Sequence, residues 1–145
     1  MKKLIITILF ICTNIPLFPK DKFTSVQIIY SSLDYPTPLF YEPIYFDLGS
    51  CEDKCDTLEI KDAQDIDKLV NSLKNLNPSK HLTLDTRGKL IFKRPFAKMD
   101  NIWVYWGIAD IQIGLNGKIF CMSQYFANTL DEIFYKYKNT YFFKK

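Results

Sequence analysis

The chain has 145 residues, of which 48% are hydrophobic and 24% charged, so it is long enough for one domain with a core and too apolar for disorder. Its formal net charge is +3 and falls to +1 if a leader containing Lys2 and Lys3 is removed. A nearly neutral domain lacks the clustered basic surface of nucleic-acid-binding proteins, so we expect no nucleic-acid partner.

Residues 1–19 have the pattern of a secretion signal. Two lysines precede an apolar run, Leu4–Ile11, and prolines and lysines close the segment. The run is too short to span a bilayer, which needs about 20 apolar residues. We therefore predict an exported protein, periplasmic or extracellular, with a single domain at 20–145. Because no small-x-small cleavage site follows the run, an uncleaved membrane anchor and lipidation at Cys12 stay open as alternatives.

The cysteines are interpreted in that compartment. Three residues separate Cys51 from Cys55, and in an oxidising compartment a short-range disulfide between them is the default. With His81, the only histidine, the pair also forms a ligand set typical of some exported copper proteins, because thiolates and imidazole suit Cu(I). Acidic neighbours oppose thiolate formation, so the disulfide is favoured. Cys121 is predicted to be a buried small hydrophobic residue.

Runs of β-branched and aromatic residues predict a mainly antiparallel sheet. We expect strands at 23–31, 44–48, 57–60, 83–93, 102–108 and in a hairpin within 110–123. Arg87-Gly88 predicts a turn or bulge. The hairpin follows from Asn116-Gly117, which supplies the two positive-φ positions of a type I′ turn. That turn pairs Leu115 with Lys118 and Ile113 with Phe120.

An amphipathic helix is predicted at about 62–76. Asp62 is its expected N-cap, and apolar residues recur every three or four positions as far as Leu76, before Asn77-Pro78. Capping and a solvated helix face account for the carboxylates of this helix, Asp65 included, without a catalytic role.

A second amphipathic helix is predicted at about 124–138, with Ser123 as its N-cap. Its apolar face carries Phe126, Leu130, Ile133, Phe134 and Tyr137. The residues expected to lie away from that face are Asp131, Glu132, Lys136 and Lys138.

These elements predict an α+β fold, in which two amphipathic helices pack on a single antiparallel, meander-type sheet. The layout is similar to that of small exported bacterial domains with a leader, a capped helix, a meander carrying Asn-Gly-Lys and a closing helix. The resemblance covers most of residues 57–138 and implies the fold but no activity.

Aromatic residues make up 16% of the chain, and a core of rings explains most of them. Trp103, Tyr105 and Tyr125 are the candidates for an exposed aromatic binding surface. Arg87 joins them, because Asp85–Lys89 has the composition of an anion-binding loop, although a polar hairpin turn explains it better.

No motif in the sequence fixes a reaction or a cofactor. Phosphate-binding glycine loops, histidine-based zinc sets and nucleophile elbows are absent, and nothing local supports a nucleophilic pair of Cys51 or Cys121 with His81. The favoured hypothesis is a non-catalytic exported protein that binds another protein through a sheet edge or the disulfide loop, in an inhibitor, immunity-type or envelope-accessory role. The alternative is a copper-binding or thiol-redox protein that uses Cys51, Cys55 and His81. Membrane contact is expected only through an uncleaved leader.

Overall fold

The computed structural model describes residues 23–31, 55–80, 86–95, 102–107, 112–115 and 118–143. The strands are β1 (Ser25–Ser31), β2 (Cys55–Ile60), β3 (Thr86–Lys93), β4 (Ile102–Gly107), β5 (Gln112–Leu115) and β6 (Lys118–Cys121), and the helices are α2 (Ala63–Ser72) and α3 (Gln124–Lys138). The predicted leader at 1–19 and the predicted strand at 44–48 lie outside the described residues. Among the helices that are described, none combines the length and apolarity that crossing a membrane requires.

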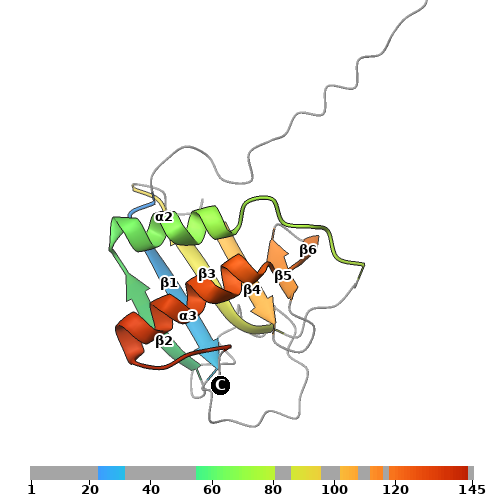
Figure 1. Ribbon diagram of the computed structural model, residues 1–145. Coiled ribbons are helices and arrows are strands. Elements are labelled where there is room, and N and C mark those ends of the chain that lie inside the picture. The colour runs from blue at the N-terminus through green and yellow to red at the C-terminus, as the bar shows by residue number, and fades with distance from the viewer. Residues whose placement is uncertain are drawn as a thin grey trace, which may run out of the picture.

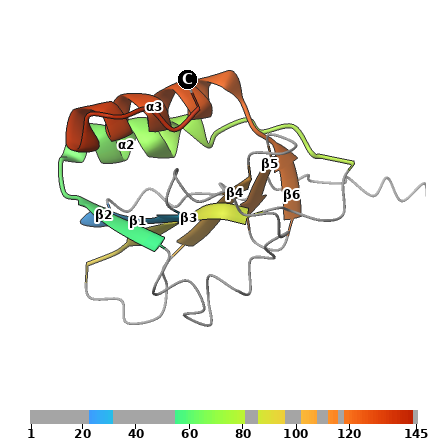
Figure 2. The ribbon, with the colours of Figure 1, turned by 90° about the horizontal axis from the view of Figure 1, so that it is seen from below.

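The six strands form one sheet in the order β2-β1-β3-β4-β5-β6, and every neighbouring pair is antiparallel. From β3 to β6 the sheet is a meander. At its other end, β2 and β3 flank β1, so α2 carries the chain from one side of β1 to the other. Both helices lie side by side on one face of the sheet (Figures 1 and 2). The predicted α+β fold is therefore confirmed.

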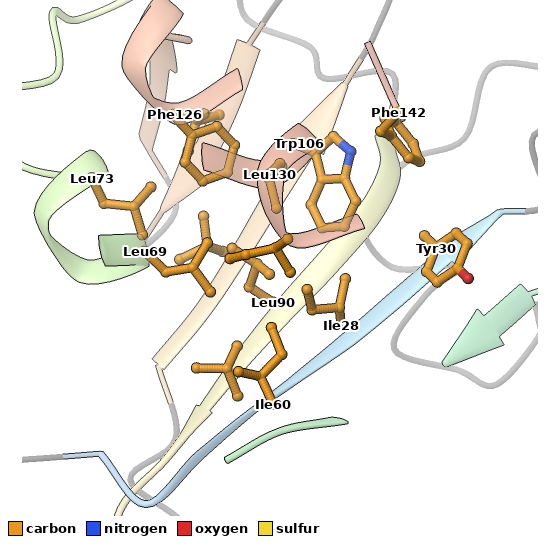
Figure 3. Packing of buried hydrophobic residues seen from close by; sticks show 14 of the residues in the cluster. Ile28, Tyr30, Ile60, Leu69, Leu73, Leu90, Trp106, Phe126, Leu130 and Phe142 are labelled. Carbon is orange, nitrogen blue, oxygen red and sulfur yellow. The ribbon is translucent and has the colours of Figure 1, made fainter. Parts of the chain in front are cut away.

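A row of apolar side chains crosses the helix-facing side of the sheet. The register aligns Leu58, Ile28, Leu90, Val104 and Leu115 on five consecutive strands. All of them are buried in one core with residues of both helices, and Figure 3 shows part of this cluster. Burial of each such side chain contributes about 1.5–3 kcal/mol, so the row is a main source of stability.

Helix α2 begins as predicted and ends earlier. The Asp62 side chain accepts hydrogen bonds from the backbone N–H groups of Gln64 and Asp65, both at 3.0 Å, as an N-cap should. The helix ends at Ser72 rather than near 76. Asn75 has a φ of 59°, which takes the backbone out of the helix although buried Leu73 continues the apolar stripe.

Helix α3 spans the predicted residues. Ser123 Oγ accepts a hydrogen bond from the backbone N–H of Phe126 at 3.1 Å, which confirms the expected N-cap. Asn139 ends the helix in the left-handed conformation, with a φ of 52°. This conformation turns the chain back after α3.

The predicted hairpin pairing is confirmed, because Leu115 lies opposite Lys118 and Ile113 opposite Phe120. The outer edge of β6 is also paired. The N–H of Ser79 donates to the Ile119 carbonyl at 2.9 Å, and the N–H of Cys121 donates to the Asn77 carbonyl at 2.8 Å. A segment that follows α2 therefore covers this edge of the sheet.

Gly88 occupies a position in β3 that no larger residue fits. It lies between Tyr30 of β1 and Trp106 of β4, next to a bulge that begins at Thr86. A Cβ atom added at Gly88 would lie 2.1 Å from Cζ2 of Trp106, so the indole ring packs directly over the glycine. The predicted bulge at Arg87-Gly88 is thereby confirmed, and its glycine makes room for the largest buried side chain.

Candidate binding surface

The predicted copper set is not assembled within the described residues. Cys51 and His81 both lie outside them, whereas Cys55 begins β2 opposite Ser31. The Cys55 sulfur belongs to a disulfide, so it is not a thiolate ligand. The part of the chain that the structure describes contains no group of three metal-binding side chains. The pairing of Cys55 with Cys51 stays a prediction.

Two other predictions about this chemistry are corrected. Cys121 is a free thiol and is exposed on β6, not buried, because β6 is the last strand of the sheet and this position lies at its surface. The predicted hairpin turn at Asp85–Lys89 is also wrong, because its residues from Thr86 onward belong to strand β3 (Thr86–Lys93). Arg87 is half-buried there, and its carbonyl accepts a hydrogen bond from Ser31 Oγ at 3.3 Å.

The four residues predicted as a binding surface divide between two layers of the molecule. Trp103 and Tyr105 belong to β4, where their backbones pair with Ile91 and Lys89, and Arg87 belongs to β3. Tyr125 lies in α3, in the helical layer on one face of the sheet, and is 55% exposed.

A cluster that we call the helix junction joins α2 to α3. Asp65 is buried, and its Oδ2 accepts hydrogen bonds from Lys136 Nζ at 2.6 Å and from the Tyr137 hydroxyl at 2.9 Å. Lys136 Nζ also lies 5.1 Å from the centre of the Tyr137 ring. The predicted solvated position of Asp65 is therefore wrong, because α3 supplies partners 71 and 72 residues further along the chain.

The helix junction shifts the pKa values of Lys136 and Tyr137. The hydrogen bond to Asp65 raises the pKa of Lys136 above its ordinary value. Desolvation and the hydrogen bond to Asp65 raise the pKa of Tyr137. At neutral pH Lys136 is therefore charged and Tyr137 protonated, and both donate hydrogen bonds that hold the two helices together, which indicates a structural cluster.

A second cluster, the tail junction, fixes residues 139–143 against the core. Asp131 is 1% exposed, and its Oδ1 accepts hydrogen bonds from the backbone N–H groups of Phe142 and Phe143, both at 2.7 Å. The prediction that Asp131 lies away from the buried face is corrected here. The segment after α3 folds back and buries this carboxylate.

Phe142 fills an aromatic recess in the tail junction. Its ring centre lies 6.3 Å from that of Tyr30, 5.6 Å from that of Trp106 and 5.3 Å from that of Phe134. Phe142 is 7% exposed. Figure 3 shows it beside Trp106, with the indole nitrogen on the side of the ring that faces Phe142. This nitrogen is buried and has no hydrogen-bond partner among the described residues.

Tyrosines gather on the outer side of α3 and on the segment that follows it. Tyr125, Tyr135 and Tyr141, which we call the tyrosine face, are between 42% and 55% exposed. The rings of Tyr135 and Tyr141 stack with centres 4.8 Å apart and planes 13° apart. Tyr125 and Tyr135 are ten residues apart, about 2.8 helical turns, so their side chains lie about 80° apart around α3. No local signal predicts the contribution of Tyr141, which depends on the tail junction.

Comparisons of this chain with protein-family models, with curated proteins and with solved structures find no match.

Proposed function

We propose that this chain is an exported, non-catalytic domain that binds another protein through the tyrosine face. The observation that carries the proposal is the exposure of three large aromatic side chains on α3 and the segment after it, two of them stacked. Tyrosine is enriched at protein–protein interfaces and at their energetic hot spots, because it combines a large apolar ring with a hydroxyl that can stay hydrated. Export is proposed from the leader pattern in the sequence.

The sheet edges offer less to a partner than α3 does. At the β6 edge, backbone groups of Ile119 and Cys121 are already paired with residues 77–79. At the β2 edge, exposed Glu59 forms ion pairs with Lys61 at 3.2 Å and with Lys93 at 3.9 Å. Charged side chains on an edge strand oppose the pairing of another strand. The tyrosine face therefore replaces the sheet edge as the proposed surface.

Site-specific photocrosslinking in the cells that make the protein tests this proposal. A photoreactive phenylalanine derivative replaces Tyr135 in the full-length chain, and in a matched variant it replaces Thr57, which is exposed on the edge strand β2. Mass spectrometry then identifies the crosslinked proteins. We expect a discrete adduct from position 135 that weakens when Tyr125 is changed to alanine.

Two results would reject the tyrosine face. An adduct at position 57 and none at position 135 would assign binding to the sheet edge. Absence of adducts at both positions, with the variants folded and exported, would contradict the binding function itself. Truncation of a hot-spot tyrosine typically costs about 2 kcal/mol or more of binding free energy, so Tyr135→Ala should weaken a purified complex about 30-fold.

A further inference from the structure

We infer that the recess filled by Phe142 is a peptide-binding site that the chain closes with its own residues 139–143, and that it accepts in trans a peptide carrying an aromatic side chain. The residues that line this site are not those of the tyrosine face, although the segment that closes it carries Tyr141, which belongs to that face. It uses the carboxylate of Asp131 and the rings of Tyr30, Trp106 and Phe134.

The contacts that hold residues 139–143 are ones that a segment of another chain can make equally well. Asp131 recognises two consecutive backbone N–H groups, which peptides in general possess. The recess recognises a ring, which it surrounds with edge-on and tilted aromatic contacts. The ligand class is therefore a peptide with an aromatic residue whose own N–H and the next N–H are free to donate.

The chain's own segment leaves one recognition group of the site unused. Trp106 is 0% exposed, and its indole N–H, which lies on the Phe142 side of the ring, has no hydrogen-bond partner among the described residues. Buried indole N–H groups are usually paired, and an aromatic ring face is a weak acceptor. A peptide that places an oxygen acceptor beside this nitrogen gains a hydrogen bond that Phe142 does not provide.

The geometry also allows the segment to leave. Residues 139–143 contain no helix or strand, and they turn back at Asn139, a residue type that adopts either the left-handed φ of 52° seen here or extended backbone. If Asn139 adopts extended backbone, the segment leaves the recess while the α3 hydrogen bonds stay intact. In the closed state the segment is tethered to its site, at an effective concentration of order millimolar, so it suppresses binding of a weaker peptide.

Binding of a synthetic peptide to the full-length chain tests the inference. The probe has the sequence of residues 139–145 with a fluorophore at its amino end, and fluorescence anisotropy reports binding. The Phe142→Ala chain, whose recess is open, should bind the probe at least about tenfold more tightly than the natural chain does. A probe with alanine in place of its first phenylalanine is the matched control and should not bind.

The Asp131→Ala, Phe142→Ala double variant checks that the probe occupies this site. It should bind about tenfold more weakly than Phe142→Ala, because the acceptor for two peptide N–H groups is gone. Equal binding by both variants, or equal binding of the two probes, would overturn the inference. Because the readout is binding of the probe and neither variant substitutes Tyr125, Tyr135 or Tyr141, either result leaves the proposed function to its own crosslinking test.

If Phe142→Ala does not fold, the natural chain supplies the measurement. Its two tryptophan indole N–H resonances are distinguished with Trp103→Phe, and the unlabelled probe peptide is added to millimolar concentration. A saturable shift of the Trp106 resonance, absent with the alanine control peptide, supports the inference, and an unmoved resonance contradicts it.

Discussion

The helix junction and the tail junction each place a buried carboxylate beside α3, but with different partners. Asp65 receives hydrogen bonds from the Lys136 ammonium group and from a phenol, and the Lys136 side chain is 52% exposed. Asp131 receives them from two peptide N–H groups beside a buried ring. The first contact joins two helices through groups that titrate and that water can solvate. The second fixes a short segment through two peptide N–H groups, which do not titrate, and aromatic burial accompanies it.

This difference indicates separate roles. The helix junction adds little to the stability of the fold, since an ion pair whose lysine is half-exposed contributes only modestly. The tail junction depends on packing around Trp106, which is supported by Gly88 on one side and by Phe142 on another. Variants of these residues should therefore differ in size of effect and in whether the damage is global or local.

The largest effect is expected from Gly88→Ala. The added Cβ would lie 2.1 Å from a ring carbon of Trp106 in the middle of the sheet, so the indole or the strand must shift. Overpacking of this severity costs about 3 kcal/mol of unfolding free energy, measured by urea denaturation. The control is Thr57→Ala on exposed β2, which should change stability by less than about 0.5 kcal/mol. Equal stability of the two variants would show that Trp106 does not need the space over Gly88.

Phe142→Ala should have the next largest effect, and it should be local. Loss of a buried phenylalanine typically costs about 3–5 kcal/mol of unfolding free energy. Here residues 139–143 can detach while the rest of the chain stays folded, so the cost cannot exceed the free energy that holds this segment, and we expect about 2 kcal/mol. Hydrogen exchange should show lost protection of the amide at residue 143, while amides of β3 keep theirs. Uniform loss of protection across the sheet would show that the segment is an integral part of the core.

Asp131→Asn should be milder than Phe142→Ala. Asparagine keeps an oxygen that can accept a hydrogen bond but loses the charge that strengthens it, so we expect a cost of about 1 kcal/mol. Asp67→Asn is the matched control, because Asp67 is exposed on α2 and should change stability little. If Asp131→Asn also left the amides of Phe142 and Phe143 fully protected, charge would have no part in the tail junction.

Local signals in the sequence were sufficient where the structure depends on neighbours along the chain. The Ser123 cap and the apolar stripe define α3 at its observed bounds, and Asn116-Gly117 predicts the pairing of Ile113 with Phe120. The same stripe placed the end of α2 too late. Apolar spacing shows which side of a helix is buried but not where the backbone leaves it, as Asn75 does here.

Non-local contacts explain what the sequence did not reveal. The partners of Asp65 lie more than 70 residues away, and the burial of Asp131 depends on a segment that folds back after α3. Tyr125 was a candidate binding residue from the sequence, but Tyr141 joins Tyr135 only because the tail junction positions it. Helical periodicity carries no information about such a return of the chain.

The smallest effect, and the sharpest contrast between the junctions, is expected in the pH dependence of stability. Lys136 and Tyr137 have raised pKa values in the folded chain, so their contribution is complete below the pKa values of the unfolded chain and is lost as pH rises through the folded ones. Asp65→Asn should therefore flatten the alkaline decline in stability. Asp131→Asn should leave it unchanged, because peptide N–H groups do not titrate there.

The acid side gives the internal control for this experiment. The backbone N–H of Asp65 lowers the pKa of Asp62, so the contribution of this cap is present above the unfolded pKa and is lost as pH falls through the folded one. Asp65→Asn keeps that N–H and should preserve the acid decline. Urea midpoints measured from acid to alkaline pH for the natural chain and both variants decide the matter. An alkaline decline of the same size in Asp65→Asn would mean that the hydrogen bonds to Asp65 add nothing to it, leaving the burial of Tyr30 and Tyr137, which also raises their pKa values, as its source.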